Sequence, residues 1–151
     1  MREMTTPRTV AVLGYGGLIP FVGCAAMSVL DASWAAALTV YGAVILSFVG
    51  ALHWAFAMQA PSLSSSERTA LYVWSVVPSL LAGVALLLSP RIGGGLLILG
   101  FLAHLVRDRR LPAGVTVPVW YRALRLRLTL VAVVCIAVGV FAPGAVALSS
   151  G

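Results

Sequence analysis

The stretch from Trp34 to Met58, WAAALTVYGAVILSFVGALHWAFAM, decides the fold. It contains no Asp, Glu, Lys or Arg. A helix of this length, about 25 residues, rises about 37 Å, which exceeds the roughly 30 Å hydrocarbon core of a bilayer. Lipid offers no hydrogen-bond partners to backbone groups, so a helix is the conformation expected there. The stretch predicts a membrane-spanning helix.

The composition of the whole chain agrees with this prediction. Hydrophobic residues make up 61% of the 151 residues and charged residues 9%, whereas soluble domains carry about 25% charged residues. A soluble fold of this size cannot hide so much apolar surface. We therefore expect a single transmembrane domain over residues 1–151.

Further apolar runs flank the first one. The expected architecture is all-α, a polytopic membrane helical bundle of five transmembrane helices, with spans at about residues 9–30, 34–58, 70–88, 90–107 and 126–148. The sequence FVGC at residues 21–24 resembles a lipoprotein cleavage box. The apolar run continues past it to Leu30, which is too long for a signal-peptide core, so we expect no cleavage.

The connections between the spans carry helix-ending and helix-capping signals. Residues 31–33 form a polar turn before the second span, and Ser66 is expected to cap the third, with Glu67 in its first turn. Ser89 and Pro90 suit the start of the fourth span. An Arg-rich loop is expected over residues 107–127, because its two prolines forbid one continuous helix.

The distribution of Arg predicts the orientation. All ten basic residues are Arg, and the formal net charge is +6. Five spans place nine Arg on the side of the N-terminus and of the loop at 107–127, and leave Arg91 on the other side. The positive-inside rule then makes the N-terminus cytoplasmic, in a bacterial inner (plasma) membrane. Because these Arg flank apolar spans, we expect contacts with membrane lipids and none with nucleic acid.

Four short segments carry a family resemblance. They are GLIPF at residues 17–21, YGAVILSF at 41–48 followed by HW at 53–54, WSVVPS at 74–79, and WYRALR at 120–125. In this order they resemble the domain of unknown function 3429 family of transmembrane protein 69-like small inner-membrane proteins, over about residues 14–129. The resemblance implies a multi-span inner-membrane protein and brings no activity, cofactor or catalytic residue with it.

His53 is the foremost candidate site residue, because an ionisable group inside a span is by default a functional hypothesis. Its helix face holds Gly42, Leu46, Val49, Gly50 and Ala57. The alternative interpretation is a neutral His that hydrogen-bonds between helices. His104 is expected at a similar depth, and two such His side chains could bind a haem axially, although nothing else in the sequence favours one.

Other candidates lie near the same leaflet. Pro78 frees the carbonyl of Trp74, and Ser75 or Ser79 could hydrogen-bond there; Ser75, Ser79 and Gly83 would form a small-residue packing ridge. Arg122 and Arg125 share a helix face suited to an anionic headgroup. The candidate ligand-binding residues are His53, Trp54, Trp74, Ser75, Pro78, Trp120, Arg122 and Arg125. Each has a plain alternative interpretation in packing or in positive-inside charge.

The missing motifs bear on function. The spans as assigned hold no Asp or Glu, which argues against a cation-coupled transporter. The sequence has no Ser–His–Asp set, Cys-x-x-Cys pair or phosphate loop, and a metal site would have two His without an acidic partner. We therefore expect no cofactor and no metal. The sequence offers no support for enzymatic activity, and an enzyme or haem protein that uses His53 is the third hypothesis. The leading hypothesis is an accessory or assembly partner of another membrane protein. The alternative is a binder or carrier of an amphiphilic anionic lipid or quinone-like ligand at the cytoplasmic leaflet.

Overall fold

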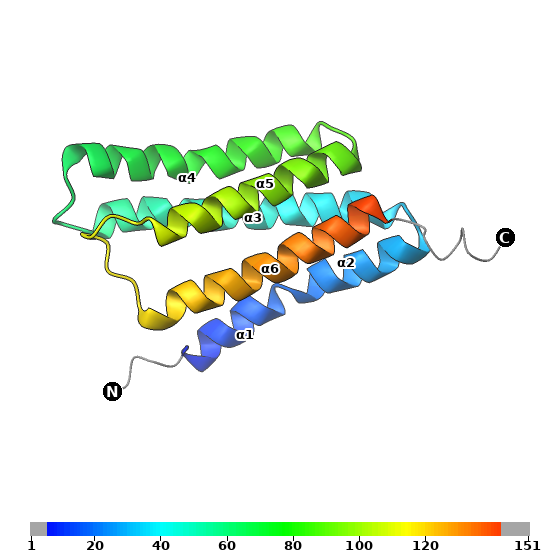
Figure 1. Cartoon of the computed structure of the whole chain (residues 1–151), viewed down its shortest axis with the longest axis horizontal. Helices are drawn as coiled ribbons and strands as arrows, with labels where there is room; N and C mark the ends of the chain where they lie inside the picture. Colours follow the sequence, from blue (N-terminus) through cyan, green and yellow to red (C-terminus); the bar gives the residue numbers. More distant parts are fainter. Residues whose placement is uncertain (1–5, 143–151) are drawn as a thin grey trace.

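The structure is a computed structural model that describes residues 6–142. Within that range the chain forms six helices and no strand (Figure 1). The helices are α1 (Arg8–Gly16), α2 (Ile19–Leu30), α3 (Trp34–Gln59), α4 (Ser65–Leu86), α5 (Pro90–Arg109) and α6 (Val119–Phe141). The all-α prediction is therefore correct.

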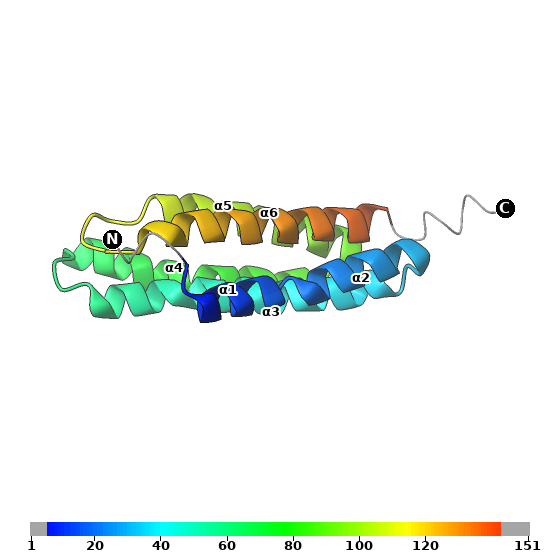
Figure 2. The ribbon, with the colours of Figure 1, turned by 90° about the horizontal axis from the view of Figure 1, so that it is seen from below.

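Helix α3 lies at the centre of the bundle. It packs against α2, α4, α5 and α6, and Figure 2 shows α5 and α6 side by side in a layer over α3 and α4. The buried side chains along its length include Leu38 and Leu46, neither of which is exposed at all. The residues predicted to share the face of His53 are buried as well, which confirms that face.

Within the described residues, four segments are long and apolar enough to cross a bilayer: Arg8–Leu30, Trp34–Gln59, Ser65–Leu86 and Val119–Phe141. Helix α5 does not meet the same criterion, although it packs against α3, α4 and α6. Over residues 6–142 the protein is therefore all-helical, with four candidate spans, as in a multi-pass membrane protein.

The first segment is broken rather than continuous. Helix α1 ends at Gly16 and α2 begins at Ile19, with Pro20 in the first turn of α2. Pro20 has no N–H to donate to the preceding turn, so the break falls where the sequence places the proline. The hydroxyl of Tyr41 donates a 2.8 Å hydrogen bond to the carbonyl of Gly17 and so ties α3 to this break.

The hairpin between α3 and α4 corrects one prediction. The N-cap of α4 is Ser64, not Ser66: the Ser64 hydroxyl accepts from the Glu67 N–H, and the Glu67 carboxylate accepts from the Ser64 N–H at 2.9 Å. This reciprocal capping box needs Ser and Glu three residues apart, a spacing that Ser66 does not have. Arg68 donates to the carbonyls of Ala57 and Ala60, which satisfies the C-terminal end of α3.

The Arg-rich segment is shorter than predicted. Helix α5 continues to Arg109 and α6 already begins at Val119, so the loop covers residues 110–118 instead of 107–127. Pro118 ends the loop as the N-cap residue of α6. Charged side chains near a span end do not stop a helix, because they extend toward the interface. The predicted end of the last span, Leu148, lies outside the described residues.

Small residues allow the helices to pack closely, but they are not the small residues that were predicted. Ser79 is exposed, and a Cβ on Gly83 would meet no atom within 4 Å, so the Ser75–Ser79–Gly83 ridge is wrong. The face of α4 that packs is built instead from Ser75, Pro78, Ala82 and Ala85. Four-residue steps drift away from a 3.6-residue period, and a seven-residue step (Ser75 to Ala82) returns to it.

Candidate functional site

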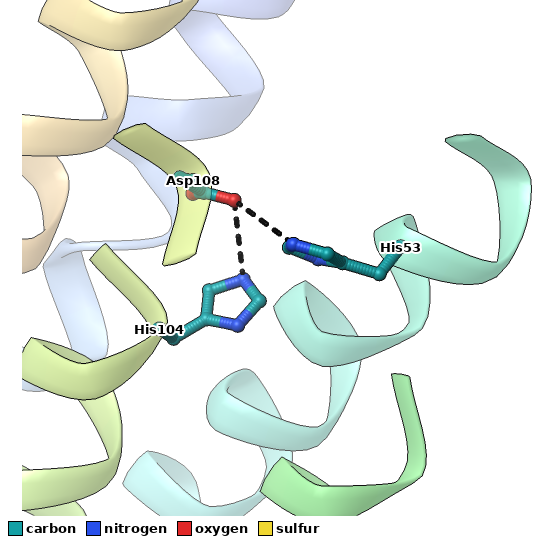
Figure 3. Close-up of side chains that lie close together, drawn as sticks. All are labelled: His53, His104 and Asp108. Atoms are coloured by element: carbon teal, nitrogen blue, oxygen red, sulfur yellow. Dashed lines mark ion pairs between the residues drawn. The ribbon is translucent and has the colours of Figure 1, made fainter. Parts of the chain in front are cut away.

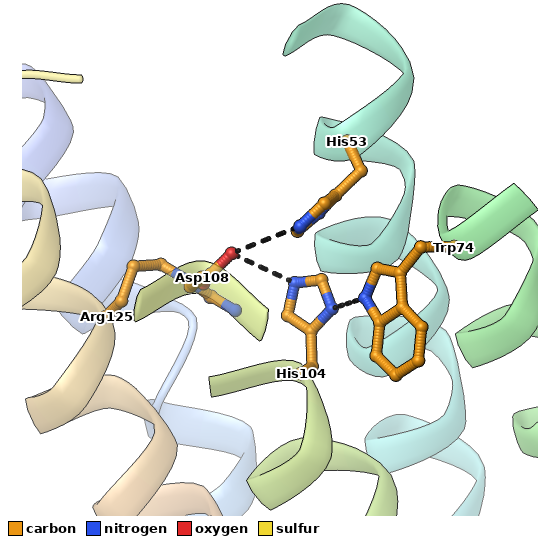
Figure 4. Close-up of polar contacts among 5 residues, drawn as sticks. All are labelled: His53, Trp74, His104, Asp108 and Arg125. Atoms are coloured by element: carbon orange, nitrogen blue, oxygen red, sulfur yellow. Dashed lines mark hydrogen bonds and ion pairs between the residues drawn. The ribbon is translucent and has the colours of Figure 1, made fainter. Parts of the chain in front are cut away.

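A buried polar cluster lies where four helices meet. His53 comes from α3, Trp74 from α4, His104 and Asp108 from α5, and Arg125 from α6 (Figure 4). His104 and Asp108 are four residues apart and therefore lie on one face of α5. Both His side chains are fully buried, and Asp108 is 1% exposed. A cluster of this kind inside an apolar bundle is costly and calls for a specific reason.

Asp108 is the centre of the cluster. Its Oδ2 accepts a 2.7 Å hydrogen bond from Arg125 Nε. Its Oδ1 faces Nε2 of His104 at 3.6 Å and Nε2 of His53 at 3.8 Å (Figure 3). Arg125 is 7% exposed, so the carboxylate and the guanidinium balance each other's charge away from water. With both histidines neutral, the cluster as a whole carries no net charge.

Trp74 fixes the state of His104. The indole Nε1–H donates a 3.1 Å hydrogen bond to Nδ1 of His104, and the planes of the two rings are nearly parallel, at 10°. An indole nitrogen can only donate, so Nδ1 must be the unprotonated nitrogen. In neutral His104 the proton is then on Nε2 and points toward Asp108.

Several polar atoms of the cluster are buried without a hydrogen-bond partner. They are both ring nitrogens of His53, Nε2 of His104, Oδ1 of Asp108, Nη2 of Arg125 and the hydroxyl of Tyr121. Native proteins leave few such groups, and each costs about 1–3 kcal/mol. Their concentration in one place is typical of a binding site.

An apolar groove runs past this cluster. Its volume is about 520 Å³, and its walls come from α1, α2, α3, α5 and α6. Leu13 and Phe48 at its rim are more than half exposed. Tyr121 and Arg125 are part of its wall, together with Thr129. The two unpartnered donors, the Tyr121 hydroxyl and Arg125 Nη2, therefore belong to residues that line an otherwise apolar groove.

The cluster resembles a metal centre but fits one poorly. Atoms of His53, His104 and Asp108 lie within 4.8 Å of one another. A metal ligand must offer a lone pair, and Trp74 leaves His104 with a proton on the nitrogen that faces the centre. Arg125 has already neutralised the carboxylate, so a divalent ion would add uncompensated charge.

The haem interpretation does not fit either. The ring centroids of His53 and His104 are 4.8 Å apart, in an edge-to-face contact. Axial ligation places one imidazole on each side of the iron, with the macrocycle between them. Two rings in direct contact leave no space for it.

The structure brings together some of the predicted site residues. His53, Trp74 and Arg125 meet in the cluster, and Trp120 lines the groove. Arg122 is exposed and does not join Arg125 in the cluster; it lines a separate pocket with residues of the loop that precedes α6. The other three lie outside the cluster: Trp54 is exposed and contacts Tyr72, Ser75 donates to the Tyr72 carbonyl, and Pro78 packs against Gly50.

Asp108 was missed by the sequence reasoning, and the two statements that depended on it are wrong. The expected fourth span ends at Arg107, which leaves Asp108 in a loop, and the expected pair of histidines has no acidic partner. Helix α5 instead extends to Arg109 and places Asp108 next to both histidines. The four-residue spacing of His104 and Asp108 was the signal available. The hydroxyl of Tyr121 is buried beside this cluster as well, and the sequence analysis did not single it out.

The fold and this cluster define a class: small multi-pass helical membrane proteins with a buried ionisable centre. Residues 6–141 match the family described as "Protein of unknown function (DUF3429)". The chain belongs to this family, as its motifs indicated.

Two curated relatives carry the name Transmembrane protein 69. The chain is 38% identical to the Xenopus tropicalis protein over 133 residues, which cover 84% of this chain and 51% of that protein. It is 28% identical to the Mus musculus protein over 133 residues, which cover 85% and 54%. The chain thus spans about half the length of the curated relatives it matches. No solved structure matches it.

Proposed function

We propose that this protein binds an amphiphilic molecule in the groove, with the molecule's polar end against Arg125 and Tyr121. One observation carries the proposal: Arg125 and Tyr121 line an apolar groove, and each has a buried donor without a hydrogen-bond partner, Nη2 of Arg125 and the hydroxyl of Tyr121. An oxygen atom that accepts both hydrogen bonds removes two unfavourable contacts. The headgroup is therefore defined by acceptor oxygens, such as those of a carbonyl, carboxylate or phosphate.

The dimensions and surroundings of the groove support the same function. Its volume of about 520 Å³ lies within the roughly 300–1,000 Å³ of typical ligand pockets. Its exposed rim at Leu13 and Phe48 would face the acyl chains of a bilayer, which gives a lateral route for an amphiphile.

Native mass spectrometry of protein extracted in mild detergent tests the proposal. Leu128 lines the groove, and Leu130 on the same helix is 48% exposed and lies outside it. Leu128→Trp fills the groove, while Leu130→Trp adds the same side chain to the outer surface. We expect one bound amphiphile on the wild type and on Leu130→Trp, and its loss from Leu128→Trp. Equal occupancy in both variants would contradict the function.

The proposed topology has five spans, with the N-terminus in the cytoplasm of a bacterial inner membrane. Support comes from α5, which is packed on three sides by other helices, and from the Arg distribution. Except for Arg91, the Arg residues of α5 and α6 lie toward the helix ends that the loop 110–118 joins. Arg91 lies at the opposite end of α5. Single cysteines at Ala113 and Ser89, in a chain whose Cys24 and Cys135 are replaced by Ala, should label from opposite sides. Labelling from the same side would exclude a spanning α5.

A second candidate is the accessory role in a membrane complex. The observation that favours it is an aromatic pair on the outer face of α3 and α4, where the rings of Trp54 and Tyr72 lie 4.7 Å apart. Aromatic side chains are common at helix–helix interfaces of complexes. Mild purification should recover a stoichiometric partner that Trp54→Ala releases, and a monomer at native expression would contradict this role.

A further inference from the structure

The hydrogen bonds of the cluster decide which group can take up a proton. A second proton on His104 would sit on Nδ1, where the Trp74 N–H already donates. Two donors would then face each other, so His104 cannot become charged without losing that bond. Asp108 Oδ2 accepts a hydrogen bond from Arg125 Nε at 2.7 Å, so a proton on that oxygen would break this bond. At these two atoms, His104 Nδ1 and Asp108 Oδ2, uptake of a proton therefore costs a hydrogen bond.

His53 differs from both. Neither of its ring nitrogens has a partner, although the side chain is fully buried. Its Nε2 faces the free oxygen of Asp108 at 3.8 Å. Protonation of His53 breaks no hydrogen bond and places a positive charge beside a carboxylate. His53 is the group of the cluster that is able to gain a proton.

The charges around His53 determine when His53 can take up a proton. Helix α5 brings the negative charge of Asp108, the positive charge of Arg107 and neutral His104, and α6 brings the positive charge of Arg125 with neutral Tyr121 near Asp108. Helix α4 brings neutral Trp74, and α2 and α3 bring no charged side chain near it. A proton on His53 leaves the buried centre with net positive charge, which low-dielectric surroundings oppose. A further negative charge close to the cluster would balance this positive charge and remove the cost of burying it.

The groove is where such a charge would lie. A headgroup that accepts from Arg125 Nη2 and the Tyr121 hydroxyl would lie beside Arg125, which donates to Asp108, the residue that His53 faces. If this headgroup is an anion, it and the proton cancel each other's charge within the cluster. Each then strengthens the binding of the other by the same factor.

We propose that the site binds an amphiphilic acid as a pair, with its anionic headgroup against Arg125 and Tyr121 and one proton on His53 facing Asp108. This inference rests on the proposed function and adds the charge class of the ligand. A free fatty carboxylate and a phospholipid share the required chemistry, which is an anionic oxygen headgroup on an apolar tail.

Two probes separate this inference from the function on which it rests. Hexadecanesulfonate stays anionic at every working pH, and methyl palmitate is neutral. Calorimetry of delipidated protein in mild detergent, repeated in buffers of different ionisation enthalpy, counts the protons taken up. We expect about one proton per sulfonate bound and affinity that falls about tenfold per pH unit where His53 is neutral in the free protein. The ester should take up none.

His53→Gln should bind sulfonate without proton uptake and should still bind the ester. If Leu128→Trp abolishes sulfonate binding but the wild type takes up no proton when it binds sulfonate, the inference is overturned and the function is left intact. Binding of both probes that Leu128→Trp leaves unchanged would overturn the function itself. The native lipid, identified as a fatty acid or a phospholipid by mass spectrometry, distinguishes the two sources, and a neutral native lipid contradicts the inference.

Nitrogen NMR of the histidines gives a second measurement that needs no variant in the site. On addition of sulfonate, His53 should gain a second ring proton. His104 should keep a protonated Nε2 and an unprotonated Nδ1 throughout. A second proton on His104 instead would contradict the assignment.

Discussion

Two Tyr→Phe substitutions should change stability in opposite directions. The hydroxyl of Tyr41 donates to the Gly17 carbonyl at 2.8 Å, whereas the hydroxyl of Tyr121 is buried without a partner. Each substitution removes one oxygen atom and leaves the ring in place. The comparison therefore isolates the hydrogen bond from the packing.

The magnitudes follow from these environments. Tyr41→Phe loses one intramolecular hydrogen bond, worth about 0.5–1.5 kcal/mol, and should lower the free energy of unfolding by that amount. Tyr121→Phe removes a buried hydroxyl whose desolvation is uncompensated, which costs about 1–3 kcal/mol, so the ligand-free variant should be more stable than the wild type. The two variants should differ by about 1.5–4.5 kcal/mol.

Unfolding of delipidated protein in mixed micelles measures both values. A saturating amount of the groove's ligand should remove the advantage of Tyr121→Phe, because the hydroxyl then has an acceptor that only the wild type can use. If ligand-free Tyr121→Phe is destabilised as much as Tyr41→Phe, the hydroxyl has a partner within the protein. The interpretation of the cluster as a binding site would then be wrong.

Two further predictions concern packing and charge. A Cβ on Gly50 would lie 2.8 Å from Pro78, and one on Gly83 would meet nothing within 4 Å. Gly50→Ala should therefore lower the free energy of unfolding by about 1–3 kcal/mol. Gly83→Ala should raise it by up to about 1 kcal/mol, and thermal unfolding in detergent measures both changes. Asp108→Asn leaves the charge of Arg125 buried and alone, at a cost of about 3–5 kcal/mol, and adding Arg125→Gln should recover part of this loss in a double-mutant cycle. A double variant less stable than Asp108→Asn would contradict the ion pair.

The fold was predictable because a membrane-spanning segment must be both apolar and helical, and a local stretch of sequence shows this. An apolar run such as Trp34–Met58 must become a helix wherever it crosses a bilayer, and α3 extends from Trp34 to Gln59. The ends of the helices were less predictable. Val119 and Trp120 lie within the loop that was expected over residues 107–127, yet α6 begins at Val119. Long Arg side chains can reach the interface from within a helix, so charge is a poor marker of where a helix stops.

The site was half predictable. His53 stood out as an ionisable group within a long span, and Trp74 and Arg125 were expected near the same leaflet. Asp108 looked like a loop residue because three Arg surround it, at positions 107, 109 and 110. Its burial depends on the pairing of α5 with α6, which places Arg125 beside it. Such a contact between distant segments leaves no local signal in the sequence.

The most direct test of the central claim is an experimental structure of the protein in lipid nanodiscs. The claim is that the groove holds an amphiphile whose headgroup is bound by the two unpartnered donors. The account predicts elongated density along the groove, with an oxygen within hydrogen-bond distance of both Arg125 Nη2 and the Tyr121 hydroxyl. A groove closed by side chains, or a lipid whose headgroup lies at the far end from Arg125, would contradict it.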